Sequence, residues 1–326
     1  MEVFQHTLLQ MAVLSTAVIL GVLGRKLKIL NDDTDTRLSQ VVMTFAIPCL
    51  ILDSVLGNTN LPSSELLITT FGYSTLSSVF TCLFAVAAVS LMYRNAPKAS
   101  KGIHMFLISF GNTGQIGFAV LAAIFGSTGV LYGAICNIPY TFFMFSVGVV
   151  FILSSAASEN KPKSRQEKNN QLKLRLKEII HHLLSPCLIA SLISMFLAMY
   201  GITDSGYIGQ TCELIGGMTI PLSMLVIGST LSKQPIKEML TDAWAFISSA
   251  LRLLVVPLMI YFLGGLVIPD QTVLSVIAIQ AAMPAAVAGT MMCLSYGGDT
   301  LTMTRATFIT TVLSLLTMPL IAAIVV

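Results

Sequence analysis

The sequence predicts an all-helical protein that crosses a membrane ten times, and three observations support this fold class. First, the chain of 326 residues is 55% hydrophobic and 10% charged, whereas soluble domains carry about 25% charged residues. Second, the apolar residues form blocks close to the ~20 residues that a helix needs to cross a bilayer. Third, Lys and Arg occur in alternate connections between these blocks. We expect spans at 7–24, 38–56, 66–92, 103–125, 129–153, 186–202, 207–231, 243–267, 272–296 and 300–326.

The positions of the basic residues predict the orientation of the spans. All but Arg252 and Arg305 of the 18 Lys and Arg residues follow spans 1, 3, 5 and 7. Cytoplasmic loops are enriched in Lys and Arg, so we expect these loops inside and both termini outside. The stretch MEVFQH before span 1 has no basic residue, which argues against a cleaved signal peptide.

The six cysteines have no spacing typical of a disulfide framework or a metal site. We therefore interpret them as small core residues, and we expect no cofactor. They are Cys49, Cys82, Cys136, Cys187, Cys212 and Cys293.

A polar stretch divides the chain into two sets of five spans, at 1–153 and 186–326. The connecting loop, 154–185, begins as a linker rich in Ser, Lys, Asn and Gln. Its second part has apolar residues at helical spacing among basic ones, which predicts an amphipathic helix on the inner membrane face. A solvated loop is the alternative. The apolar residues are Leu172, Leu176, Ile179 and Leu183.

The two halves resemble one another. FAIPCLILDSVL in span 2 matches MTIPLSMLVIGSTL in span 7, with Pro48 aligned to Pro221. AAIFGSTG at the end of span 4 matches CLSYGGD at the end of span 9. Because each half has an odd number of spans, the second copy enters the membrane inverted. Inverted repeats with broken helices at the midplane are typical of secondary transporters.

Spans 4 and 9 contain the strongest paired interruptions. Span 4 includes Gly111, Asn112, Gly114 and Gly117, and span 9 includes Pro284 followed by AAVAG. Glycine and proline weaken helices, and small residues let backbones approach closely. The amide groups that start each second half-helix would suit a carboxylate. The alternative is ordinary packing of small residues. Pro48 and Pro221 are interpreted as structural kinks.

Several polar residues at membrane depth have open roles. Ionisable groups there are functional candidates, so Asp53 and Glu213 are either proton-coupling groups or lie in water at the headgroup boundary. Arg252 and Arg305 are predicted to form structural pairs or to reach the inner surface, with direct substrate contact as the alternative. Both arginines, like Asp299, are candidate coupling or charge partners. Neutral groups that either line a cavity or join helices are Gln115, Asn137, Tyr140 and Gln280.

Four motifs resemble the auxin efflux carrier family, which includes bacterial malate or malonate permeases and plant carriers. The motifs are GNTGQIGF, IPLSMLVIGSTL, RLLVVP and QAAMPAAV. The resemblance implies that helices 1, 2, 6 and 7 form a scaffold that often dimerises. Helices 3–5 and 8–10 would form a transport domain in which helices 4 and 9 cross, with an elevator-like motion. The chain departs from the family because Gly117–Ala123 has no proline, and the absence of a long hydrophilic domain favours the bacterial type.

We therefore expect a secondary carrier of a small organic anion, a mono- or dicarboxylate, in the plasma membrane, with H⁺ or Na⁺ as candidate coupling ions. Its expected partners are this anion, membrane lipid and a second copy of the chain, without nucleic acid. The alternative is a membrane sensor that binds a ligand without moving it. Neither a nucleotide-binding loop nor a paired-aspartate protease motif is present. The expected substrate-binding residues are Gly111, Asn112, Thr113, Gly114, Gln115, Asn137, Gln280, Met283, Pro284 and Ala285.

Overall fold

The computed structural model describes residues 2–58, 61–155, 184–203, 206–232 and 242–326, and the regular elements in these ranges are helices. The amphipathic helix predicted near 172–183 lies outside these ranges. The first half contains α1 (Glu2–Lys26), α2 (Asp32–Val41), α3 (Ile47–Leu56), α4 (Ser64–Met92), α5 (Lys98–Ser109) and α6 (Phe118–Ser155). The second half contains α8 (Pro186–Met199), α9 (Tyr207–Gly216), α10 (Thr219–Ser232), α12 (Ala243–Ala250), α13 (Val256–Gly264), α14 (Gln271–Ala281), α15 (Ala288–Tyr296) and α16 (Thr300–Val325).

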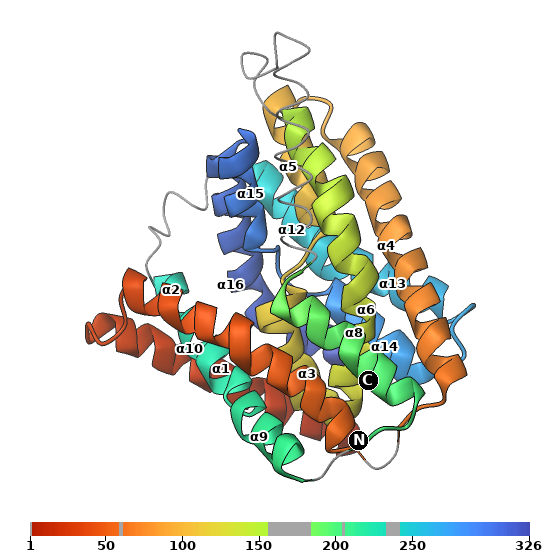
Figure 1. Ribbon diagram of the computed structural model, residues 1–326. Coiled ribbons are helices and arrows are strands. Elements are labelled where there is room, and N and C mark those ends of the chain that lie inside the picture. Colours follow the sequence, from red (N-terminus) through yellow and green to blue (C-terminus); the bar gives the residue numbers. More distant parts are fainter. Residues whose placement is uncertain (1, 59–60, 156–183, 204–205, 233–241) are drawn as a thin grey trace, which may run out of the picture.

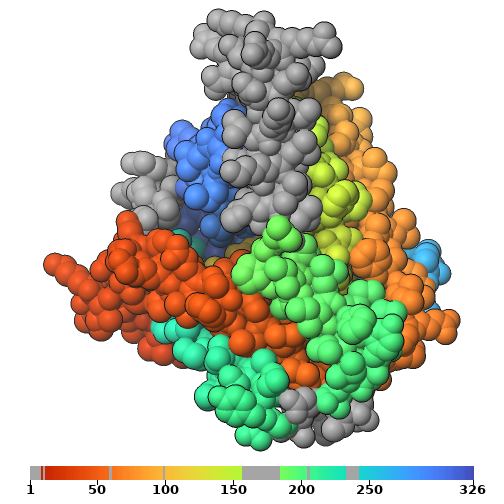
Figure 2. Space-filling model, viewed as in Figure 1, coloured from red at the N-terminus to blue at the C-terminus, as the bar shows by residue number. Residues whose placement is uncertain are grey.

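The helices separate into two groups in Figure 1. One group, here called the layer, contains α1–α3 and α8–α10; within it α1 packs on α10, and α3 packs on α8 and α9. The other group, here called the bundle, contains α4–α6 and α12–α16; in this view α5, α12 and α15 lie above the layer, and α4 runs down beside it on the right. In Figure 2, α3, α8 and α9 form much of the lower surface of the molecule.

Six helical stretches in the described residues are long and apolar enough to cross a membrane, so the protein is a multi-pass membrane protein. They are Asp32–Leu56, Ser64–Met92, Thr113–Ser155, Tyr207–Ser232, Ala243–Gly264 and Thr300–Val325. The number is lower than the ten predicted spans partly because helices are interrupted. Predicted span 9, for example, is divided between α14 and α15, and each is shorter than a bilayer crossing.

A glycine divides the longest of these stretches. Within Thr113–Ser155, Gly126 has φ 61° and ψ −147°, which is not helical. Residues with a Cβ avoid this conformation, whereas glycine adopts it readily. The break lies where the sequence predicted the end of span 4, in the AAIFGSTG motif.

Wide turns precede two prolines in the described chain. The π-helical turn η1 (Val42–Ala46) comes before Pro48, and the π-helical turn η4 (Leu251–Val255) comes before Pro257. A proline ring clashes with the carbonyl group four residues earlier, and it has no N–H group to donate; a wider turn relieves this conflict. Pro221 lies in the first turn of α10, after a break at Gly217. Pro48 and Pro221 therefore both lie at the start of a helical segment, directly after an interruption.

All six cysteines are free thiols. Five are buried, and Cys49 is partly buried. Their interpretation as small core residues is confirmed for the five buried cysteines.

Candidate substrate-binding site at the helix crossover

The interruptions of predicted spans 4 and 9 pair with one another. After α5 ends at Ser109 the chain is extended, and the π-helical turn η2 (Thr113–Gly117) then leads into α6. The backbone N–H of Asn112 donates to the carbonyl of Pro284 at 2.7 Å, and the N–H of Ala286 donates to Phe110 at 3.1 Å. These bonds make an antiparallel bridge between Gly111 and Ala285. Each interruption thus satisfies backbone groups of the other, as a membrane interior requires.

Arg252 of η4 joins the first halves of both interrupted helices. Its side chain is buried, with 1% exposure. The guanidinium donates to the carbonyls of Ile108 and Ser109 at the end of α5, at 3.2 and 2.9 Å. It also donates to the carbonyls of Gln280 and Met283 around the end of α14, at 3.4 and 3.0 Å. Helix C-termini leave carbonyls without intrahelical partners, and a planar guanidinium with five N–H groups can serve several of them at once.

The sequence had predicted a structural pair or a position at the inner surface for Arg252. The structure shows instead a buried cation held by neutral carbonyls. In the described residues it forms no ion pair with a carboxylate; the salt bridges there join Arg25 to Asp32 and Asp35, and Arg37 to Asp33.

Side-chain hydrogen bonds fix the crossover to α6 and α16. The Thr113 hydroxyl donates to Asn137 at 3.0 Å, and the Gln280 amide donates to the carbonyl of Gly133 at 3.0 Å. From α6, Tyr140 donates to the carbonyl of Gly111 at 2.6 Å. From α16, the Thr310 hydroxyl accepts the backbone N–H of Ala285 at 3.1 Å. Asn137 and Gln280 therefore join helices, which was one of the two roles that the sequence left open.

A cavity of about 350 Å³ lies between the crossover and the layer. Asn112 and Gln115 line it from the crossover side, and Ser39 of α2 and Thr230 of α10 line it from the layer side. Among the described residues the lining has no charged side chain. The remaining lining residues are Ile116, Val226, Ile227, Leu231, Val287, Thr290, Met291, Thr304, Thr307, Phe308 and Thr311.

Two helix N-termini face this cavity. Asn112 caps η2, because its side-chain oxygen accepts the N–H of Gln115 at 3.1 Å. Val287 precedes α15 and provides no side-chain cap. A helix N-terminus carries a partial positive charge of about half an elementary charge and favours anions. The cavity therefore combines neutral hydroxyl and amide groups with a positive electrostatic potential from the backbone.

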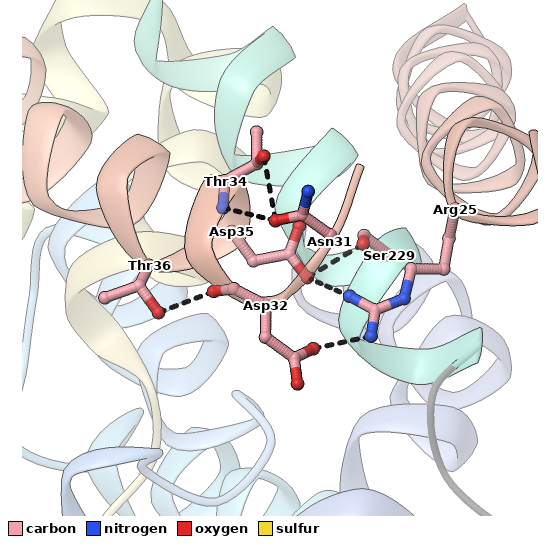
Figure 3. A network of polar contacts seen from close by, with 7 residues as sticks. All are labelled: Arg25, Asn31, Asp32, Thr34, Asp35, Thr36 and Ser229. Atoms are coloured by element: carbon pink, nitrogen blue, oxygen red, sulfur yellow. Dashed lines mark hydrogen bonds and ion pairs between the residues drawn. The ribbon is translucent and has the colours of Figure 1, made fainter. Parts of the chain in front are cut away.

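An ion-pair network supports the layer side of the cavity (Figure 3). Arg25 at the end of α1 donates to Asp35 of α2 at 3.1 Å and pairs with Asp32 at 2.5 Å. Ser229 of α10 donates to the same oxygen of Asp35 at 2.8 Å. The hydrogen bond that Arg25 donates to Asp32 raises the pKa of Arg25. Because Ser229 precedes Thr230 and Asp35 lies one turn before Ser39, the network holds the wall formed by α2 and α10.

The structure does not bring every predicted residue to this cavity. Asp53 of α3 and Glu213 of α9 lie near one another but outside its lining. Asp299 caps α16 by accepting the N–H and the hydroxyl of Thr302. Arg305 is partly buried on α16 and is also outside the lining. The buried Met283 and Ala285 form the crossover itself.

Sequence reasoning missed the threonines of α16. Thr304, Thr307 and Thr311 recur every three or four residues and line the cavity together. This spacing places side chains on one face of a helix. The stretch TLTMTRATFITT therefore contains the pattern that predicts a polar helix face.

Paired helix interruptions beside a cavity, in a multi-pass helical protein, are typical of membrane transporters. A family model described as "Membrane transport protein" matches residues 6–322. The chain belongs to this family, which is the auxin efflux carrier family that the motifs resembled. It is a transport protein and not an enzyme.

Two archaeal proteins are similar over almost the whole chain. An uncharacterized transporter of Methanothermobacter thermautotrophicus is 24% identical over 304 residues, with 93% of each chain covered. A second uncharacterized transporter, from Methanocaldococcus jannaschii, is 24% identical over 309 residues, with 93% of this chain and 94% of the relative covered.

Proposed function

We propose that the protein is a secondary carrier that moves a small organic anion, and that the anion binds in the cavity beside Asn112. The observation that supports this most is the contact between a cavity of about 350 Å³ and the paired helix interruptions. In secondary transporters, broken helices direct their positive N-termini toward anionic substrate groups.

The lining favours an anion with one carboxylate and an apolar body. A carboxylate near Asn112 would meet the N-termini of η2 and α15, and no cationic side chain in the described lining offers a second site. The apolar body would contact residues such as Ile116, Met291 and Phe308. A compact dicarboxylate would leave its second charge without a partner, which is costly in a low-dielectric site.

The proposed architecture has ten spans in two inverted repeats, with helices 4 and 9 crossing. The bridge between Gly111 and Ala285 supports it, because these residues occupy matching interruptions in the two halves. The separation into layer and bundle (Figure 1) supports an elevator-like motion of the bundle past the layer. In this proposal, both termini lie outside the plasma membrane.

We further propose that two copies dimerise through the layer. Its outer surface carries exposed apolar side chains, including Phe45, Ile208 and Leu214. Coupling to H⁺ or Na⁺ is also a proposal; because Asp53 and Glu213 lie outside the cavity lining, a coupling role for them would be indirect.

Counterflow in proteoliposomes tests the carrier function. The purified protein is reconstituted, and exchange of radiolabelled malate, malonate and indole-3-acetate is measured at two pH values, with and without sodium. We expect Asn112→Ala and Pro284→Ala to reduce exchange. Gln271→Ala is the control, because this side chain is exposed and, among the described residues, donates to Tyr261 away from the cavity. If both crossover variants fold and exchange as well as the control, the site is wrong. Binding without counterflow would indicate a sensor.

A further inference from the structure

The charge on Arg252 has no acidic counterpart in the described structure. Arg stays protonated at physiological pH, and this side chain is 1% exposed. A buried charge without an opposite charge is expensive. Some other feature of the protein or its ligand must therefore balance it.

The carbonyls around Arg252 belong to two helix C-termini, those of α5 and α14. Each C-terminus carries a partial negative charge of about half an elementary charge. One guanidinium therefore offsets both negative ends at the crossover. Because a helix dipole has no net charge of its own, the net positive charge of Arg252 remains. Without it, these ends would oppose the binding of an anion nearby.

The two N-termini at the crossover keep their positive partial charge. One is the start of η2, which continues into α6, and the other is the start of α15. Asn112 and Val287 precede them and line the cavity, whose described lining has no carboxylate. Two such ends sum to about one positive elementary charge, which matches the charge of one carboxylate.

A single backbone segment, at Gly111 and Asn112, separates Arg252 from the cavity. A Cβ atom on Gly111 would lie 2.1 Å from Nη2 of Arg252, so the guanidinium lies directly against Gly111. The next residue, Asn112, faces the cavity. Across such a short distance in a medium of low dielectric constant, the guanidinium charge acts strongly on a bound anion.

We propose that Arg252 is the countercharge of the transported anion and acts on it through the backbone of the crossover, as a positioning residue. This inference rests on the proposed carrier function. The crossover then carries one uncompensated positive charge when the site is empty and none when it holds a monoanion. A membrane potential therefore acts on the return of the empty bundle and not on the movement of the loaded one.

Membrane potential provides a test with the wild-type protein. Radiolabelled indole-3-acetate at pH 7.5 is the probe, and a potassium gradient with valinomycin sets the potential. Exchange uses only loaded steps, so we expect its rate to be independent of potential. Net uptake needs the empty return, so we expect its rate to depend on potential. An exchange rate that changes with potential would overturn the inference.

A charge-neutralising variant tests the residue itself. Ser109 and Arg252 line a common small cavity of about 30 Å³, and Ser109 is 3% exposed. Within the described part of the chain its Oγ has no nitrogen or oxygen partner, and it lies beside Cys82. Ser109→Asp would place a carboxylate beside the guanidinium without removing it, and Ser109→Asn is the neutral control of similar size. We expect Ser109→Asp to raise KM at least about tenfold over Ser109→Asn and to make exchange depend on potential.

The outcomes separate the two proposals. If the wild-type protein exchanges none of the three anions, the carrier function itself fails, and the inference fails with it. If it exchanges indole-3-acetate but the two Ser109 variants show equal KM values and equal responses to potential, only the inference fails. If it exchanges malate and not indole-3-acetate, the monoanion countercharge is wrong while the carrier function stands. If Ser109→Asp does not fold, the comparison of exchange and net uptake in the wild-type protein still tests the inference.

Discussion

Gly111 and Arg252 are packed so closely that a Cβ atom on Gly111 would lie 2.1 Å from Nη2 of Arg252. The same Cβ atom would lie 2.9 Å from the carbonyl oxygen of Met283. The absent side chain is what allows the guanidinium to reach the carbonyls of both interrupted helices. The close packing at the crossover therefore requires glycine at position 111.

We expect Gly111→Ala to destabilise the protein, because either the guanidinium or the bridge must move. Overpacking of this kind costs about 1–3 kcal/mol, so the midpoint of thermal unfolding in detergent should fall. Gly72→Ala is the control, since a Cβ atom there would meet nothing within 4 Å, and alanine favours a helix by about 1 kcal/mol over glycine. Equal midpoints for Gly111→Ala and wild type would contradict the packing argument.

Asn112→Asp should separate folding from binding. Aspartate caps a helix as well as asparagine does, so the unfolding midpoint should stay near that of the wild-type protein. The added negative charge faces the cavity and should raise KM for an anion by at least about tenfold. Asn112→Ser keeps a cap without a charge and serves as the control. A normal KM for Asn112→Asp would show that the anion does not bind beside this residue.

Thr307→Val tests the cavity face of α16. Thr307 lines the cavity, and its buried hydroxyl makes no hydrogen bond in the described structure. If the anion supplies the missing partner, removal of the hydroxyl should raise KM about fivefold, which corresponds to a hydrogen bond of about 1 kcal/mol. The ligand-free protein should not lose stability. Thr16→Val is the control, because this exposed threonine lies on α1 and its hydroxyl donates to the carbonyl of Ala12. Unchanged transport in Thr307→Val would remove this residue from the site.

Asp35→Asn should destabilise the cavity wall that α2 and α10 form. Asp35 is 8% exposed and accepts hydrogen bonds from both Arg25 and Ser229. We expect the free energy of unfolding to fall by about 1–3 kcal/mol, the cost of leaving buried polar groups poorly paired. Asp33→Asn is the matched control, because the Asp33–Arg37 pair is about three-quarters exposed and such pairs contribute about 0–1 kcal/mol. Denaturant titration of both variants measures the difference, and equal losses would refute a special role for Asp35.

The sequence alone determined the membrane class, the family and the places where the helices break. Long apolar blocks and basic loops are local properties of the chain, and the cost of burying polar backbone in lipid leaves few structures that satisfy them. Gly111, Asn112 and Pro284 weaken helices through their own covalent structure. The sequence therefore predicts the helix breaks without knowledge of the tertiary structure.

The partners of the polar residues required the tertiary structure. Arg252 appears in the sequence as an isolated cation in an apolar segment, and nothing near it in the chain identifies the carbonyls of Ile108 and Met283 as its acceptors. Carbonyl groups occur in every residue, so the acceptor choice has no sequence signature. The cavity likewise depends on how α2, α10 and α16 converge on the crossover, because its neutral lining comes from segments far apart in the chain. Packing between such segments, and not the composition of any one of them, sets where a buried charge finds its partners.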